Sequence, residues 1–160
     1  MILYHGSNAS IEQPRLLATQ RDLDFGKGFY LTSDFGQARS WARRSVRIRG
    51  KGQAIVSCYE ADEDRLMDSL RVLRFSSADK EWLDFVTTNR RGTVVESKWD
   101  IVIGPVANDQ TFPTLLLYMD GVLDADSTIR QLLPQKLRDQ FTFKTEKALS
   151  FLKFIEAREV

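Results

Sequence analysis

The chain has 160 residues, of which 42% are hydrophobic and 28% charged, and its formal net charge is +1 at pH 7. This length suits one compact domain with a full core, so we predict a single domain over residues 1–160. The small net charge excludes a general electrostatic attraction to nucleic acid or membranes. One cysteine, Cys58, and one histidine, His5, exclude an internal disulfide, a cysteine zinc site and a histidine metal cluster.

The N-terminal residues, MILYHGSN, lack the positive leader and the long apolar region of a signal peptide. No run of the sequence approaches the roughly 18 apolar residues of a membrane span. We therefore expect a cytoplasmic protein that does not associate with a membrane.

The first residues, 1–5, are apolar and predict a buried strand that ends at His5. Residues 8–22 are polar without a clear period, so we expect a loop or a short helix there. Arg15 and Arg21 are the cations nearest the site proposed below, and a pyrophosphate needs such a donor. A solvated surface position is the simpler interpretation of both.

Residues 24–42, DFGKGFYLTSDFGQARSWA, predict a glycine turn, a short strand and a helix. Asp34 is placed to cap the helix, and the apolar side of that helix has helical spacing. Tyr30 and Trp41 lie on the adjoining strand and helix, where they can form the two walls of a slot for a flat ring. The alternative is that both aromatic side chains are ordinary core residues.

The helix is followed by the strongest run of positive charge in the chain, from Arg43 to Lys51. Cations near the C-terminus of a helix are favourable and often simply solvated. The functional alternative is a surface for an acidic target, either nucleic acid or an acidic protein.

The second half of the chain alternates predicted strands and helices. We expect a strand at 53–61, then a helix or turn, and a strand at 70–75. A helix follows, which Ser76 or Ser77 opens and Gly92 ends, and then a strand at 99–103 closed by Gly104-Pro105. The last elements are an apolar segment at 114–119, a helix at 127–137, an alternating strand at 139–145 and a final helix from 146 capped by Thr145. Asp100, Asn108 and Asp109 cluster near the 99–103 strand. They suit capping and turns better than acid–base catalysis.

Two stretches carry a family resemblance. Residues 25–42, FGKGFYLTSDFGQARSWA, resemble the signature of the poly(ADP-ribose) polymerase catalytic domain, in which a Gly-Lys-Gly-aromatic-Tyr run leads into a helix with a second aromatic residue. Residues 3–7, LYHGS, resemble the strand that opens the same domain. The chain therefore resembles the ADP-ribosyltransferase superfamily of the polymerase and diphtheria-toxin type, and also a compact bacterial family of uncharacterised domains of this fold.

The resemblance implies a site for NAD, with no metal. His5 holds a ribose hydroxyl, the backbone of Gly6 and the hydroxyl of Ser7 bind the nicotinamide amide, and Tyr30 and Trp41 stack on the nicotinamide ring. Gly28 belongs to the same cofactor-binding set. The implied fold is α+β, with a split, mostly antiparallel β core, flanking helices and a cleft between its halves.

The third catalytic position of this family is a glutamate at the start of a late strand, and here we place Gln140 there. The implied catalytic set is therefore His5, Tyr30 and Gln140. A neutral amide can hold a ribose hydroxyl but cannot act as a base. Glu146, Glu60 and Asp24 are the alternative carboxylates for the site.

The function implied is an NAD-dependent mono-ADP-ribosyltransferase, a glycosyltransferase that modifies an unknown protein or nucleic acid. By analogy with small stand-alone members, it is a candidate toxin of a toxin–antitoxin pair, with a small antitoxin protein as partner. The alternative function is an inactive module that binds NAD or ADP-ribose, and the replacement of glutamate by Gln140 favours it. A third alternative is an RNA-directed transferase that uses the Arg43–Lys51 run.

Overall fold

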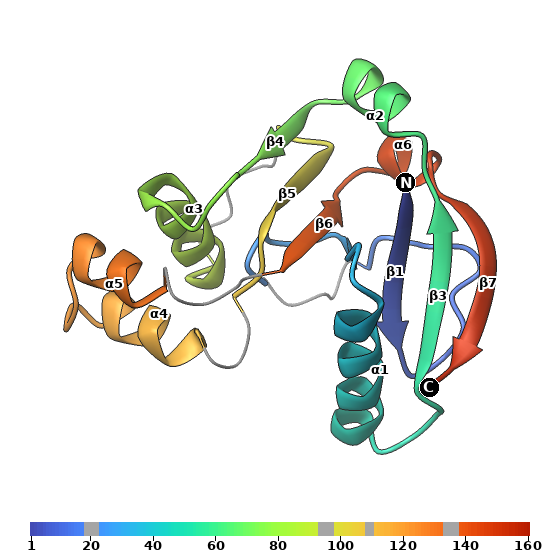
Figure 1. Ribbon diagram of the computed structural model, residues 1–160, viewed down its shortest axis with the longest axis horizontal. Helices are drawn as coiled ribbons and strands as arrows, with labels where there is room; N and C mark the ends of the chain where they lie inside the picture. Colours follow the sequence, from blue (N-terminus) through green and yellow to red (C-terminus); the bar gives the residue numbers. More distant parts are fainter. Residues whose placement is uncertain (18–22, 93–97, 108–110, 133–137) are drawn as a thin grey trace.

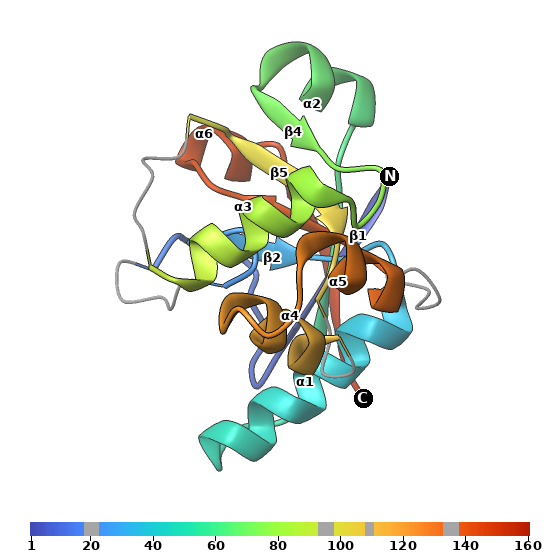
Figure 2. The same cartoon turned by 90° about the vertical axis from the view of Figure 1, so that its left-hand side faces the viewer.

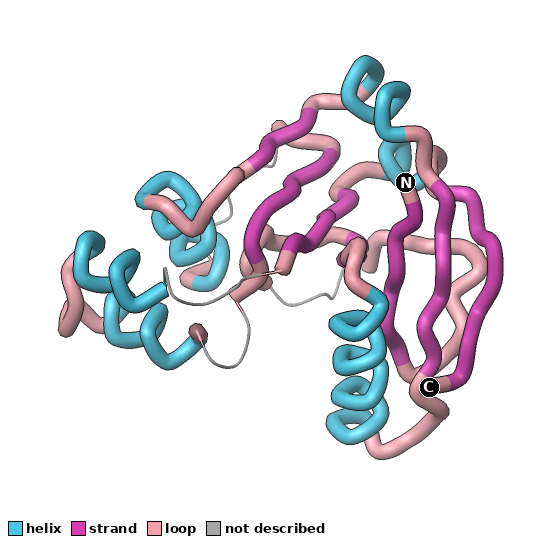
Figure 3. The backbone as a smooth tube through the Cα atoms, viewed as in Figure 1, coloured by secondary structure: helices cyan, strands magenta, loops and turns pink. Residues whose placement is uncertain are grey.

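Two β-sheets form the centre of the molecule (Figures 1 and 3). The computed structural model describes residues 1–17, 23–92, 98–107, 111–132 and 138–160. Sheet A has the order β1-β3-β7, and sheet B has the order β2-β6-β5-β4. The strands are β1 (Ile2–Ser7), β2 (Phe29–Leu31), β3 (Ile55–Glu60), β4 (Val72–Arg74), β5 (Ile101–Pro105), β6 (Asp139–Phe143) and β7 (Lys153–Glu159).

All described strand pairs are antiparallel except β4 and β5, which are parallel. The helices are α1 (Phe35–Arg49), α2 (Glu63–Ser69), α3 (Lys80–Arg90), α4 (Phe112–Met119), α5 (Ala125–Leu132) and α6 (Glu146–Leu149). The predicted α+β class with mostly antiparallel sheets is confirmed. No described helix has the length and apolar character needed to cross a membrane.

The two sheets meet where β1 lies beside β2. Tyr4 exchanges both backbone hydrogen bonds with Thr32, at 2.8 and 3.0 Å. Beyond Thr32 the chain leaves the strand, and the Asp34 side chain accepts a hydrogen bond from the Gln37 N–H to cap α1. The predicted turn, strand and capped helix are confirmed.

Three groups of apolar side chains stabilise this arrangement. The largest group lies between the sheets and includes Leu3, Leu31, Tyr59 and Phe143, which are all fully buried. The second fills the space between sheet B and helices α3, α4 and α5, which cover the outer face of that sheet (Figure 2). The third lies under α1. Because side chains alternate along a strand, β5 contributes Ile101 and Ile103 to the first group and Val102 to the second.

Helix α1 packs directly on the backbone of sheet A at Gly6. A Cβ atom added to Gly6 would lie 1.9 Å from the carbonyl oxygen of Ala38 and 2.7 Å from the backbone nitrogen of Ala42. The buried side chains of Ala38 and Ala42 are small enough to permit this approach. Glycine at position 6 is therefore required by helix–sheet packing, in addition to any role in ligand access.

The prediction of a long final helix is wrong. Thr145 does cap a helix, α6, but this helix ends at Leu149, and β7 follows as an edge strand paired with β3. Phe151 and Leu152 pack on the apolar core between the sheets, whereas Ile155 on β7 is 47% exposed. Pairing with β3 overrides a helical pattern of apolar residues that is compatible with both structures.

Other boundaries also differ from the sequence prediction. Asp79, not Ser76 or Ser77, caps α3 through a hydrogen bond to the Trp82 N–H. Strand β5 begins at Ile101 and includes Gly104-Pro105, which pair with β6. The helix expected at 127–137 begins at Ala125, and residues 133–137 lie outside the described residues.

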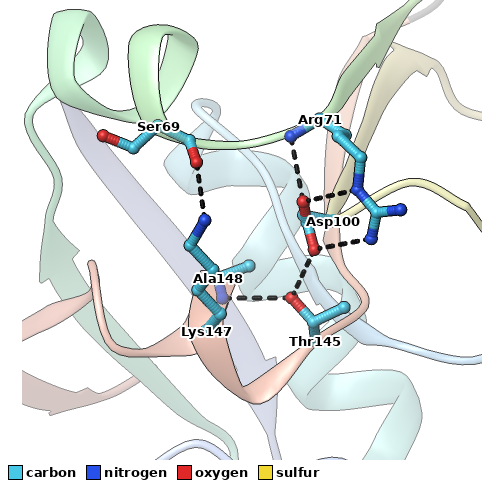
Figure 4. Close-up of polar contacts among 6 residues, drawn as sticks. All are labelled: Ser69, Arg71, Asp100, Thr145, Lys147 and Ala148. Atoms are coloured by element: carbon cyan, nitrogen blue, oxygen red, sulfur yellow. Dashed lines mark hydrogen bonds and ion pairs between the residues drawn. The ribbon is translucent and has the colours of Figure 1, made fainter.

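A buried carboxylate ties β4, β5 and α6 together (Figure 4). Asp100 accepts hydrogen bonds from the backbone and guanidinium nitrogens of Arg71, at 2.9 to 3.3 Å, and from the Thr145 hydroxyl at 3.0 Å. These contacts, led by the Arg71 side chain, lower the pKa of Asp100 to about 2. Asp100 is thus a structural anchor, as its predicted role in capping and turns suggested.

The Asp100→Asn variant is expected to lower the free energy of unfolding by about 1 to 2 kcal/mol at pH 7, because the ionised carboxylate is favoured in the folded state. Because the pKa of Asp100 is lower in the folded state, the ionised carboxylate stabilises the protein at pH values above its unfolded pKa of 3.8. That contribution disappears as pH falls toward 2. Urea denaturation of both proteins at several pH values measures it, and a difference that stays constant from pH 7 to pH 2.5 would contradict the assignment.

Candidate functional site

His5 lies on β1 at the junction of the two sheets. Its Nδ1 is 2.8 Å from the backbone carbonyl oxygen of Tyr30, and its ring stacks on Phe29 with the centroids 4.3 Å apart. A carbonyl oxygen only accepts, so Nδ1 carries the proton and Nε2 is an acceptor in the neutral ring. Burial lowers the pKa of His5, which favours this neutral form. His5 is therefore fixed as an acceptor through Nε2.

Gly6 offers its backbone at the same edge of β1. Successive residues of a strand direct their N–H and C=O groups to opposite edges. Tyr4 bonds to Thr32, so the backbone groups of Gly6, two residues on, point to this same edge, on the Tyr30 side of the antiparallel Tyr4–Thr32 bridge. They form a donor–acceptor pair that suits a carboxamide. The side chain of Ser7 is buried and shares the His5 face of β1.

The hydroxyl of Tyr30 closes the glycine turn. It donates to the carbonyl oxygen of Gly26 at 2.5 Å and accepts from the Phe25 N–H at 3.2 Å. Burial, reinforced by the nearby Asp24 carboxylate, raises the pKa of Tyr30. The hydroxyl is therefore a neutral structural group, and the half-buried ring is the part of Tyr30 available to a ligand.

The two glycines of the turn have different roles. Gly26 has φ of 75°, which favours glycine. At Gly28 a Cβ atom would lie 2.5 Å from Cγ2 of Thr142 and 2.9 Å from the carbonyl oxygen of Phe143. Gly28 therefore allows the chain to enter β2 in close contact with β6.

Trp41 lies on α1 and is half-buried. The sequence predicted that the Trp41 and Tyr30 rings form two walls of one slot. In the structure these two rings, which both belong to the described residues, make no contact with each other. Tyr30 instead packs against the apolar side chains between sheet B and α3.

Gln140 lies near the start of β6, on the same face as Thr142 and Tyr30. Thr142 pairs with Tyr30 in the β2–β6 ladder, and Gln140 is two residues before it. Gln140 is 2% exposed, and its Nε2 has no hydrogen-bond partner in the structure. The structure therefore places His5, Tyr30 and Gln140 on the adjoining strands β1, β2 and β6. The His5 ring, however, stacks on Phe29, whose side chain is on the opposite face of β2 from those of Tyr30 and Gln140.

Of the three alternative carboxylates, only Asp24 lies in this region. Asp24 is 4% exposed; Nε of Arg90 donates to its Oδ1 at 2.5 Å, and the Ala107 N–H donates to its Oδ2 at 3.0 Å. Burial raises its pKa, whereas Arg90, Ala107 and Gln140 act in the opposite direction. Glu60 is exposed and paired with Lys153 at the far end of β3, and Glu146 is exposed on α6.

Gln37, which the sequence did not indicate, is a further polar side chain of this region. It lies in the first turn of α1 and is 6% exposed, and neither atom of its amide has a partner. The Asp34–Arg138 ion pair, at 3.0 Å, holds this turn beside the start of β6. Gln37 and Trp41 share one side of α1 because they are four residues apart. No local pattern distinguishes a glutamine of this kind from a solvated one.

The predicted cations divide into two groups. Arg15 is exposed and Arg21 lies outside the described residues, so neither is placed at the site. The cations from Arg43 to Lys51 are exposed along the second half of α1 and the turn after it. Figure 2 shows the C-terminal end of this helix extending beyond the rest of the molecule. Between Asp34 and Glu60 the chain has no acidic residue.

The fold and the site define an α+β protein with a neutral polar site where its two sheets meet. The chain belongs to the family described as Protein of unknown function (DUF3990), whose model matches residues 1–154. No curated protein and no solved structure matches the chain. Within the described residues, no group of three or more histidine, cysteine or acidic side chains is arranged to hold a metal ion.

Replacing Gln37 by leucine is expected to raise the free energy of unfolding by roughly 1 kcal/mol, because two buried polar atoms without partners are removed. Chemical denaturation measures the change. The matched control is Gln131→Leu on the exposed face of α5, which is expected to have little effect. A clear loss of stability in Gln37→Leu alone would show that the amide is satisfied in solution.

Proposed function

We propose that this protein is an NAD-dependent mono-ADP-ribosyltransferase with an ADP-ribosyltransferase-like fold. The observation that carries the proposal is the meeting of His5, Gly6, Tyr30 and Gln140 where β1, β2 and β6 adjoin. These residues come from distant parts of the chain. His5, Gly6 and Tyr30 match positions of the ADP-ribosyltransferase motif, and Gln140 stands where that motif has a glutamate. Ligand sites typically combine apolar and aromatic walls with a few polar groups that fix the orientation of the ligand.

The polar groups of the site fit NAD in kind. The Nε2 atom of His5 can accept a hydrogen bond from a ribose hydroxyl, and the backbone donor and acceptor of Gly6 can bind a carboxamide. The unpartnered buried atoms of Gln37, Gln140 and Thr142 offer further neutral contacts. Tyr30 and Trp41 contribute aromatic rings, and their stacking on one nicotinamide ring requires movement of side chains on ligand binding.

The chemistry explains why we propose single transfer rather than polymer formation. The bond between nicotinamide and ribose breaks, nicotinamide leaves with the electron pair, and the acceptor adds to the ribose carbon and loses its proton. Gln140 can orient the ribose and offer the partial negative charge of its oxygen, but it cannot take the acceptor's proton. Catalysis then rests on positioning and electrostatics. Members of the ADP-ribosyltransferase superfamily without the glutamate resemble single-unit transferases or are inactive.

A second function, binding of NAD or ADP-ribose without transfer, is favoured by the same Gln140. The retained His5, Gly6, Ser7 and Tyr30 favour transfer. The two functions share a site and differ only in turnover. A role as the toxin of a toxin–antitoxin pair in the cytoplasm follows from analogy with small members of the superfamily.

The first test is release of nicotinamide from NAD by the purified protein, with and without cell lysate. We expect release that rises with lysate and falls at least tenfold in His5→Ala, because the ribose loses its acceptor. Gln131→Ala, on the exposed face of α5, serves as the matched control. Thermal melts show whether each variant is folded.

The pH dependence adds a second check on His5. Only the neutral His5 ring can accept the hydrogen bond from the ribose hydroxyl, and burial lowers the pKa of His5 below 6.5 in the folded protein. The affinity for NAD should therefore be constant from pH 8 to 6.5 and fall only at lower pH. ADP-ribose binding without nicotinamide release would favour the binding module. Absence of both NAD and ADP-ribose binding would refute the proposed function.

The basic surface of α1 is proposed to recruit an acidic acceptor. The double variant Arg43→Glu/Arg47→Glu is expected to reduce labelling of lysate components with biotinylated NAD by more than tenfold, because attraction becomes repulsion. Hydrolysis of NAD in the absence of lysate should not change. Nuclease and protease treatment of the labelled product distinguishes nucleic acid from protein. Unchanged labelling would exclude a role of this surface in the reaction.

A further inference from the structure

Asp24 connects four parts of the chain at the candidate site. It precedes the glycine turn, binds Arg90 on α3 and accepts a hydrogen bond from Ala107. Ala107 follows β5, and this strand pairs with β6 at Gly104 and Gln140. The carboxylate therefore lies at the end of β5 and the start of β6, on the face of sheet B that α3 covers.

Gln140 belongs to the same face of sheet B. Its side chain shares that face with Tyr30 and Thr142, because side chains of a strand alternate. Gln140 and Asp24 are both buried, and the Gln140 side chain is near enough to lower the pKa of Asp24, although no hydrogen bond joins the two side chains in the structure. Gln140 is also the residue that stands where the related transferases have a glutamate.

Both oxygens of Asp24 act as acceptors. Oδ1 binds the Arg90 guanidinium and Oδ2 binds the Ala107 N–H, so the group is held as an acceptor-only carboxylate. An amide beside such a group is stabilised when its nitrogen, and not its oxygen, faces the carboxylate. The Gln140 Nε2 is buried and has no hydrogen-bond partner in the structure. It is thus the donor available to Asp24.

We propose that Asp24 is a positioning residue that orients the Gln140 amide, with Nε2 toward Asp24 and Oε1 toward the ligand. Gln140 then presents an oxygen, as a glutamate would, without a second buried charge. The oxygen accepts a hydrogen bond from a ribose hydroxyl of ADP-ribose. The ligand named here rests on the proposed function, whereas the pairing of the two side chains does not.

The pairing predicts why glutamate is absent at position 140. Gln140→Glu would place a second carboxylate beside Asp24, and two such groups repel each other when both are charged. Exchange of the two groups, in Asp24→Asn/Gln140→Glu, restores one carboxylate and one amide. The charged partner of Asp24 is Arg90, and the Tyr30 hydroxyl is a neighbouring titratable group.

The experiment compares the wild-type protein with Asp24→Asn, Gln140→Glu and the exchange variant. Thermal melting is measured at pH 7.5, and affinity for ADP-ribose is measured by calorimetry. Gln140→Glu is expected to lower the melting temperature in the wild-type background and to raise it in the Asp24→Asn background. Asp24→Asn is expected to weaken ADP-ribose binding about tenfold, the effect of one hydrogen bond to a charged group, and the exchange to restore it.

Asp100→Asn is the matched control, because Asp100 is an equally buried carboxylate paired with an arginine elsewhere in sheet B. It should lower the melting temperature and leave ADP-ribose affinity unchanged. The proposal would be overturned if the change in melting temperature of the exchange variant equalled the sum of the changes in the two single variants. It would also be overturned if Asp24→Asn were folded and bound ADP-ribose with the affinity of the wild-type protein. Non-additive melting shifts without ADP-ribose binding in any protein would support the pairing and refute the proposed function.

Discussion

The contact between β1 and β2 is the constraint on which the rest of the structure depends. The two sheets are joined by two backbone hydrogen bonds between Tyr4 and Thr32 and by the hydrogen bond from His5 Nδ1 to the Tyr30 carbonyl. β2 is only three residues long, so the contact cannot continue into one extended sheet. The chain leaves the strand after Thr32, and the capped helix α1 begins.

This constraint explains the composition of the site. The groups at the junction are mostly backbone atoms and neutral side chains, because burial disfavours charge without a partner. The exception, Asp24, has both Arg90 and the Ala107 N–H as partners. A site of this type suits a ligand that is rich in hydroxyl and amide groups, at least at the end that lies between the sheets.

Much of the fold follows from local sequence signals. Asp34 and Thr145 were recognised as caps because a short polar side chain precedes a helical pattern, and β3 and β6 have clear strand patterns. The final segment was assigned wrongly, since its apolar residues fit a helix as well as a strand until β3 supplies a partner. The position of His5 beside Tyr30 was predicted by resemblance. The role of Asp24 and the burial of Gln37 were not, because they depend on contacts between segments far apart in sequence.

The Asp24 contacts have a consequence for how the protein folds. Its two partners lie 66 and 83 residues further along the chain. Closing such long loops has an entropic cost that local structure does not offset, so contacts of this kind form late in folding. The glycine turn therefore acquires its final shape only when α3 and the end of β5 have docked. Loosening of either segment should therefore disturb the turn, and the candidate site is expected to open with it when the native state fluctuates.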